Sequence, residues 1–250
     1  MYRTEQIAYV DQADKPKDLY ATTKYAILER YLRGHGPLRI FNAGCGSGEL
    51  SLRLARRGHT VVGIDPEPSY IALAVEKART CGAARCTFEV SSIESYAGPG
   101  GFDCVVSTDV LEHIEDDRAA FAKLASLVRP GGLVLLALPA VPWLFGYHDT
   151  LLGHYRRYSK RTLRALVGEH CDVASLRYFG FCLVPISLLF SRWLRRPLPF
   201  QEAVDPGRRP VSAWLLRTLF RIERWLPMPL GVSLLLKAVR KQDTPARRAA

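Results

Sequence analysis

RIFNAGCGSGE, residues 39–49, is the stretch that decides the fold of this chain. Ile40 and Phe41 predict the end of a buried strand, and residues 49–57 predict the helix that follows it. The turn between them carries Gly44, Gly46 and Gly48. Glycines are needed where a ligand rests against bare backbone, and the start of the helix offers it unpaired N–H groups and a positive dipole. The stretch therefore predicts an α/β fold with a ligand on this turn.

The glycine pattern narrows the kind of ligand. The dinucleotide fingerprint G-x-G-x-x-G is nearly matched, but its third glycine would fall at Glu49. What remains, G-x-G-x-G, resembles motif I of the class I S-adenosylmethionine-dependent methyltransferases. The next predicted strand, Thr60 to Ile64, ends at Asp65, where that family carries the acid that binds the ribose hydroxyls of the cofactor. A carboxylate suits this task because it accepts two hydrogen bonds and donates none.

Two later segments extend the resemblance. Residues 102–107 form an apolar strand that leads into TDVLEHIEDD, residues 108–117, which resembles the exit of strand 4 in the UbiE- and UbiG-like branch of the family. LVRPGGLVLLAL, residues 127–138, resembles that branch's helix end, Pro-Gly-Gly turn and fifth strand. The resemblance covers about residues 38–139, with the motifs in the expected order and spacing.

These features predict an α/β fold with a doubly wound, seven-stranded, Rossmann-like methyltransferase sheet and a helical insertion between strands 6 and 7. We expect an N-terminal segment, either a lid over the cofactor or a frayed end, and a helix over residues 1–34, followed by a cofactor-binding core over 35–178. A basic amphipathic helical insertion would follow over 179–230, and a final strand with a basic tail over 231–250. Strands 6 and 7 are predicted at residues 171–179 and 231–240.

The resemblance implies a cofactor, S-adenosylmethionine, and a set of residues that contact it. These are Asn42, Gly44, Cys45, Gly46, Gly48, Asp65, Pro66, Ser92, Ile93, Thr108 and Asp109. Two positions depart from the family pattern. Asn42 replaces the usual Asp or Glu that holds the methionine end through water, and Ser92 replaces the Asp that meets the adenine amine. Both can still form hydrogen bonds, but neither carries a charge.

The segment after strand 4 has two interpretations. Asp109, Glu112 and His113 are spaced i, i+3 and i+4, which a divalent metal could use, and some relatives complete a similar element with a later histidine. In the alternative interpretation, Thr108 and Asp109 line the cofactor. Glu112 and His113 then cap and brace the next helix. We favour the second interpretation and predict no metal.

Residues 141–163, VPWLFGYHDTLLGHYRRYSKRTL, are the predicted substrate segment. They leave strand 5 at the edge where open α/β sheets bind ligands, and they resemble an H-D-x-x-x-G-H-x-R-R-Y element of a bacterial branch of these enzymes. A neutral imidazole suits removal of a hydroxyl proton, so His154 and then His148 are the candidate catalytic bases. Paired arginines suit an anionic substrate. The predicted substrate-binding residues are Tyr155, Arg156, Arg157 and Tyr158. Ser159 is predicted to cap a helix over 160–167.

The charge of the chain is divided unequally. Residues 1–150 hold 16 Lys and Arg against 18 Asp and Glu, and residues 151–250 hold 19 against 6, which together give the net charge of +11. The excess positive charge therefore lies beyond the cofactor half, where it favours an anionic partner or is only a solvated basic surface.

The predicted insertion suggests what that partner is. Residues 211–226 place Trp214, Trp225 and several aliphatic residues on one helical face and three arginines on another. This pattern is typical of a helix in a membrane interface, and equally of a helix that packs on its own domain. No uncharged apolar run reaches the roughly 18 residues of a spanning helix. Six cysteines without a C-x-x-C pair and an N-terminus without a signal-peptide core indicate a cytoplasmic protein. If the basic helix binds membrane, the protein would be peripheral at the inner membrane face.

Together these observations predict a methyltransferase that acts on a hydroxyl of an anionic or lipid-linked small molecule, such as a glycan or isoprenoid precursor. One alternative is a methyltransferase of soluble natural products, with the insertion as a cap over the acceptor. Another is a non-catalytic, cofactor-binding partner subunit. Nucleic acid is not an expected substrate, because residues 108–111 read TDVL rather than an N-P-P-Y-like motif and the basic half contains no recognised nucleic-acid module.

Overall fold

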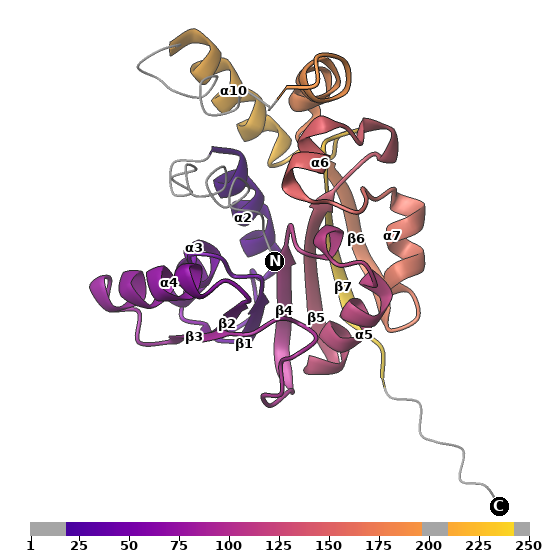
Figure 1. Cartoon of the computed structure of the whole chain (residues 1–250). Helices are drawn as coiled ribbons and strands as arrows, with labels where there is room; N and C mark the ends of the chain where they lie inside the picture. The colour runs from indigo at the N-terminus through magenta and orange to yellow at the C-terminus, as the bar shows by residue number, and fades with distance from the viewer. Residues whose placement is uncertain (1–18, 197–209, 243–250) are drawn as a thin grey trace, which may run out of the picture.

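The structure is a computed structural model that describes residues 19–196 and 210–242. The described residues form one seven-stranded sheet in the order β3-β2-β1-β4-β5-β7-β6, with helices on both of its faces (Figure 1). The predicted doubly wound sheet is confirmed. The lid expected over residues 1–18 and the tail expected over 243–250 lie outside the described residues.

The strands follow the sequence pattern closely. They are β1 (Arg39–Ala43), β2 (Thr60–Asp65), β3 (Cys86–Val90), β4 (Phe102–Thr108), β5 (Val128–Pro139), β6 (Cys171–Phe179) and β7 (Ser233–Arg240). The first five run parallel, and β7 is antiparallel to both β5 and β6. The carboxyl ends of the parallel strands therefore meet at one edge of the sheet, where ligands of such folds bind.

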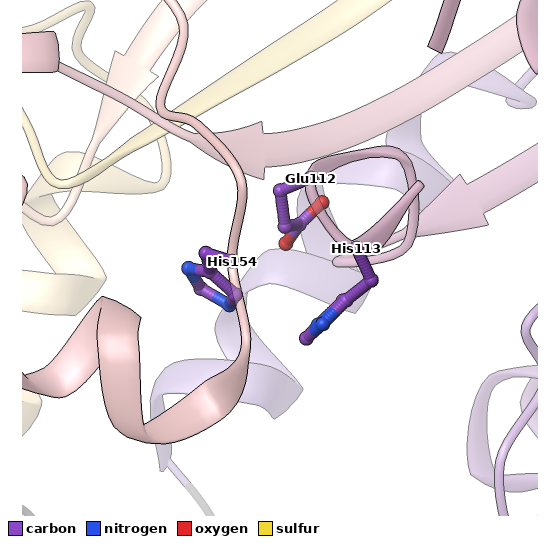
Figure 2. Close-up of side chains that lie close together, drawn as sticks. All are labelled: Glu112, His113 and His154. Atoms are coloured by element: carbon purple, nitrogen blue, oxygen red, sulfur yellow. The ribbon is translucent and has the colours of Figure 1, made fainter. Parts of the chain in front are cut away.

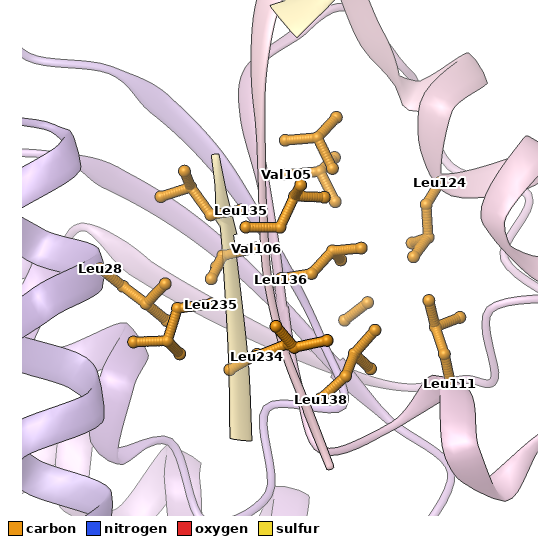
Figure 3. Close-up of a cluster of buried hydrophobic side chains, with 14 of the residues drawn as sticks. Leu28, Val105, Val106, Leu111, Leu124, Leu135, Leu136, Leu138, Leu234 and Leu235 are labelled. Atoms are coloured by element: carbon orange, nitrogen blue, oxygen red, sulfur yellow. The ribbon is translucent and has the colours of Figure 1, made fainter. Parts of the chain in front are cut away.

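Helices connect the strands and cover the sheet. Those before β6 are α2 (Leu19–Tyr31), α3 (Glu49–Arg56), α4 (Pro68–Thr80), η1 (Leu111–His113), α5 (Asp117–Leu127), η2 (Pro142–Leu144), α6 (Tyr147–Leu152) and α7 (Lys160–Val167). Figure 3 shows buried leucines on both sides of the central strands, with Leu28 of α2 on one side and Leu124 of α5 on the other. The central strands are apolar on both faces because both faces are covered.

Two local details differ from the expected pattern. The Pro-Gly-Gly turn does not separate helix from strand, since β5 already begins at Val128 and pairs with β4 around an irregularity. Gly131 has φ 74° there, so the turn forms a bulge within the strand. From the sequence, Pro66 is the expected start of the next helix, but α4 begins at Pro68. The Glu67 side chain caps this helix by accepting the N–H of Ser69.

The segment between β6 and β7 contains helices, as predicted: η3 (Phe181–Leu183), α8 (Val184–Ser187), η4 (Leu188–Trp193) and α10 (Pro210–Glu223). Figure 1 shows α10 and η4 at the end of the sheet that also carries α6. Among the helices of residues 19–196 and 210–242, none is both long and apolar enough to cross a bilayer.

Candidate active site

The glycine turn lies at the carboxyl end of β1. Gly44, Gly46 and Gly48 have φ of 68°, 51° and 82°, a region that side chains strongly disfavour. A Cβ on Gly44 would lie 2.2 Å from Cγ2 of Val110. Cys45 contributes its backbone N–H, which donates to the carbonyl of Ile64 at 2.8 Å. The turn therefore presents backbone to the edge of the sheet, as predicted, and it leaves no space for a side chain at Gly44.

Asp65 lies directly against this turn. One carboxylate oxygen accepts the N–H of Gly46 at 2.8 Å, and the other accepts the N–H of Glu67 at 3.0 Å. The residue is 7% exposed. The two backbone donors orient the carboxylate beside the glycines, where it can accept further bonds from ligand hydroxyls. Pro66, the next residue, is exposed.

Asn42 on β1 is almost completely buried. Its amide nitrogen donates to Oγ of Ser51 at 2.8 Å, whereas its Oδ1 has no hydrogen-bond partner among the described residues. An unpaired buried acceptor is costly and indicates a missing donor. A cofactor with a cationic or water-bridged end at the glycine turn fits this orphaned oxygen, so the turn, Asp65 and Asn42 together fit S-adenosylmethionine.

The remaining predicted cofactor residues flank this centre. Ile93 is buried in the core, and Ser92 forms a local turn in which its hydroxyl bonds to Oγ of Ser95 at 3.1 Å. Thr108 ends β4, and Asp109 follows it with φ 55°. Positive φ at a non-glycine residue marks a functional or constrained backbone.

Asp109 forms an ion pair with Lys24, a partner that the sequence interpretation did not single out. Lys24 lies on α2 and is only 3% exposed. Its position one turn before Ile27 and Leu28 on the buried side of that helix is the signal that could have identified it. The pair leaves Asp109 exposed on its other side, at the edge of the sheet that carries the glycine turn.

Three side chains gather beside the exit of β4: Glu112, His113 and His154 (Figure 2). Their ligand atoms all lie within 4.8 Å of one another, and the two imidazole rings meet edge to face with centroids 4.7 Å apart. Glu112 and His113 belong to η1, whereas His154 follows α6, and the N–H of Tyr155 donates to the Glu112 carbonyl at 2.8 Å. The fold therefore supplies the later histidine that the metal interpretation required, while Asp109 is paired with Lys24.

Burial controls the charge of this cluster. Both carboxylate oxygens of Glu112 are buried without a hydrogen-bond partner among the described residues, and burial together with nearby Asp109 raises the pKa of Glu112 well above its ordinary value. Burial and the neighbouring His154 lower the pKa of His113 to about 4. At neutral pH His113 is therefore uncharged, and burial favours the protonated form of Glu112. One carboxylate and two imidazoles fit the donor set of a divalent metal, which would require Glu112 to ionise.

His154 is held by a buried carboxylate. Its Nδ1 lies 2.9 Å from Oδ1 of Asp149, and Nε of Arg157 donates to the same oxygen at 2.7 Å. Burial opposes ionisation of Asp149, but the hydrogen bonds from His154 and Arg157 outweigh it and lower the pKa of Asp149. An ionised carboxylate only accepts, so His154 carries its proton on Nδ1 and Nε2 remains able to accept one.

The predicted roles of three substrate-segment residues are not those that the structure shows. Arg157 is buried against Asp149 and the Ala140 carbonyl rather than turned toward a substrate. Arg156 pairs with Asp117 at 2.8 Å, and the buried hydroxyl of Tyr158 donates to the same carboxylate at 2.8 Å. Asp117 lies outside the substrate segment, and the local sequence does not show that Asp149, eight positions before Arg157, folds back against it. Tyr155, 55% exposed, remains available to a substrate.

His148, the second candidate base, lies mostly within the protein. Its backbone N–H donates to Oγ of Ser191 in η4 at 3.0 Å, and burial lowers the pKa of its imidazole to about 4. The imidazole is therefore neutral at pH 7, and it is the backbone N–H of His148 that joins α6 to η4. The predicted cap of α7 is confirmed, since Oγ of Ser159 accepts the N–H of Thr162 at 3.1 Å.

Comparison with known proteins identifies relatives of this chain. Residues 40–132 match the family profile described as "Methyltransferase domain". A curated relative, the ubiquinone biosynthesis O-methyltransferase of Methylocella silvestris, is 39% identical over 123 residues, which is 49% of this chain and 44% of that protein. The protein of the same name from Xanthomonas euvesicatoria pv. vesicatoria is 37% identical over 173 residues, 63% of this chain and 69% of that protein. The first match spans less than half the length of its relative.

Solved structures support the fold. The magnesium protoporphyrin IX methyltransferase of Synechocystis PCC 6803, crystallised with S-adenosylmethionine, superposes with a TM-score of 0.58 at 20% identity. The superposition covers 92% of this chain and 83% of that one. At this identity the likeness establishes the architecture of the sheet and its helices, and it leaves the chemistry to the residues of the site.

Proposed function

Since the chain belongs to the class I S-adenosylmethionine-dependent methyltransferases, in their UbiE- and UbiG-like branch, we propose that it transfers a methyl group from S-adenosylmethionine to a hydroxyl of a small molecule. The observation that carries the proposal is the pair of Asp149 and His154 beside the exit of β4, at the sheet edge that also holds the glycine turn. The pair provides an oriented base where a cofactor methyl group would be presented.

The residues of the turn would hold the cofactor. Backbone groups between Gly44 and Gly48 would contact it closely, the Asp65 carboxylate would accept its ribose hydroxyls, and Oδ1 of Asn42 would receive its missing donor. When bound, S-adenosylmethionine supplies an already activated methyl group on sulfur. The protein therefore has to align the acceptor and remove its proton.

His154 would remove that proton. As the acceptor oxygen is methylated, the hydroxyl proton would pass to Nε2 of His154. Asp149 keeps the other nitrogen protonated and stabilises the imidazolium that results. Arg157 in turn keeps Asp149 ionised. The products are the methyl ether and S-adenosylhomocysteine.

The cluster also allows a second use of His154. Where a divalent cation binds, Glu112, His113 and His154 would hold it. The cation would supply a Lewis acid that makes an acceptor hydroxyl easier to ionise. This use and the base role require the same imidazole nitrogen, so they are alternatives.

We propose an anionic or lipid-linked acceptor, a glycan or isoprenoid precursor. Support comes from the excess positive charge of residues 151–250 and from relatives named for ubiquinone biosynthesis. Arg157 is buried against Asp149 and Arg156 is engaged by Asp117, so we favour the exposed Tyr155 for contact with the acceptor.

Incubation with methyl-labelled S-adenosylmethionine and a fractionated cell extract tests the proposal. Label in a lipid or glycan fraction, absent with His154→Ala, is the expected result. Label in an aqueous, low-molecular-weight natural product would favour the capped soluble acceptor instead. Cofactor binding without any labelled product would favour the non-catalytic partner subunit.

A further inference from the structure

Helix α10 packs on the domain through a face different from the one that its sequence pattern emphasises. Leu216 and Phe220 are buried, at 8% and 2% exposure. The Phe220 ring lies against Tyr20 of α2 and Phe179 of β6, with centroids 6.1 and 5.4 Å away. These contacts fix which side of α10 faces inward.

Polar contacts at the end of α10 hold it in the same orientation. The buried carboxylate of Glu223 accepts the backbone N–H groups of Gly180, Phe181 and Cys182 at 2.7, 3.0 and 3.2 Å. Arg177 of β6 donates to the carbonyls of Glu223 and Leu226. Hydrogen bonds of a buried charge are among the strongest in proteins, so the outward face of the helix is set by the fold.

That outward face is apolar over a broad sector. Its exposed side chains are Trp214 at 66%, Leu215 at 49%, Ile222 at 45%, Trp225 at 57% and Leu226 at 57%. At 100° per residue they span about a third of the helix, and the exposed Arg217 and Arg221 lie on the flank opposite Leu226. The predicted apolar face therefore turns away from the core.

A second exposed group of the same composition lies at the end of η4 and in the residues that follow it. Trp193 is 73% exposed and Leu194 is 50% exposed, and Arg192, Arg195 and Arg196 around them are exposed as well. Both elements lie at the end of the sheet that carries α6 (Figure 1). We call the exposed residues of α10 and its C-terminal turn (214–226), together with residues 192–196, the α10–η4 surface.

The charge of this surface has one sign. Within the described part of residues 180–242, Glu223 is the single acidic residue, and it is 2% exposed. A second copy of the chain would bring arginine against arginine in a symmetric pair, with no acid here to compensate. An anionic partner is complementary.

From this geometry we infer that the α10–η4 surface docks on the interface of an anionic phospholipid bilayer. Tryptophan and aliphatic side chains would enter the headgroup boundary, and the flanking arginines would meet lipid phosphates. The inference goes beyond the proposed function, since docking needs neither cofactor nor base. It would bring the carboxyl edge of the sheet close to the membrane, where a lipid-linked acceptor is found.

Vesicle flotation of the full chain tests the inference. We expect binding to vesicles of phosphatidylcholine mixed with phosphatidylglycerol, weak binding to pure phosphatidylcholine, and loss with rising salt. Trp214→Glu with Ile222→Glu should weaken binding by tenfold or more, since two apolar anchors become charges that repel the lipid. Arg217→Glu with Arg221→Glu should weaken it on the same scale.

The matched control is Leu73→Glu with Val75→Glu on α4, which are exposed by 44% and 49% away from the surface. This variant should bind as the unmodified protein does. Circular dichroism and S-adenosylhomocysteine titration check that every variant is folded, and absence of nucleoside binding in the unmodified protein would count against the proposed function alone.

Three results would overturn the inference. The unmodified protein could fail to float with anionic vesicles, the α10 variants could float as well as the unmodified protein, or the α4 control could lose as much binding as the α10 variants. Light scattering that shows a dimer dissociated by Trp214→Glu with Ile222→Glu, without vesicle binding, would assign the surface to a second copy instead. Binding of soluble polyglutamate with the affinity seen for vesicles would assign it to an acidic polypeptide.

Discussion

Asp149 fixes the tautomer of His154: its buried Oδ1 lies 2.9 Å from Nδ1, so the imidazole presents Nε2 as its proton acceptor. The two residues are five positions apart, joined by the end of α6 and Gly153 in the left-handed conformation. The Asp149 carboxylate therefore orients the ring, and Nε2 of His154 is the atom that would receive the proton.

His154→Ala should lower kcat by roughly 10²–10⁴-fold, the usual contribution of a positioned base, and leave affinity for S-adenosylhomocysteine unchanged. Asp149→Asn should lower kcat less and shift its pH profile, because an amide can accept from or donate to Nδ1 and no longer selects one tautomer. Steady-state kinetics and calorimetry measure both. His35→Ala, at an exposed histidine, is the control; undiminished turnover by His154→Ala would remove the base assignment.

Asp65→Asn should weaken S-adenosylhomocysteine binding by about 10–100-fold, since a hydrogen bond to a charged group contributes roughly 1.5–3 kcal/mol. Glu67→Gln, two positions further along the chain, should change this affinity little, because the Glu67 side chain caps α4. Isothermal titration compares the two variants. Equal affinities for both would contradict the ribose role of Asp65.

Gly44→Ala should destabilise the fold more than Gly34→Ala. Both glycines have positive φ, but a Cβ meets Val110 at 2.2 Å in the first case and nothing within 4 Å in the second. The shared conformational cost is about 1–2 kcal/mol. Urea unfolding should show the additional loss at Gly44, and Val110→Ala should recover part of it. Additive effects of the two substitutions would argue against the clash.

Stability should fall on acidification through the range set by His148. Its folded pKa, about 4, lies below the ordinary value of 6.5, so the unfolded chain binds a proton that the folded chain excludes. The contribution is complete above pH 6.5 and decreases toward pH 4, by roughly 1.4 kcal/mol per pH unit at most. His148→Gln should flatten this part of the curve of unfolding free energy against pH. An unchanged slope would show that the imidazole titrates normally.

Chelation distinguishes the two uses of His154. If the imidazole acts as the base, extensive treatment with EDTA should leave kcat unchanged, and added Zn²⁺ or Mg²⁺ should not raise it. If EDTA instead removes activity and a divalent cation restores it, the cluster is assigned to a metal. Glu112→Gln should then abolish the restoration. Metal analysis of the purified protein is the independent readout.

The sequence by itself determined the glycine turn, the acid at the end of β2 and the strands of the sheet. β6 and the cap of α7 were predicted to the residue. These features depend on local rules: side-chain periodicity along a strand, positive φ at glycine and a hydroxyl at a helix start. Some features that the structure places differently from the sequence prediction are also local, such as the position of the proline at the start of α4.

Only the tertiary structure decided which partners the charged and polar side chains take. It paired Lys24 with Asp109 and Arg156 with Asp117, brought His154 to Glu112 and His113, and chose the outward face of α10. The physical reason is that an ion pair or a buried face depends on groups distant in the chain, which meet only when the sheet is assembled. Spacing within one segment carries no information about those encounters.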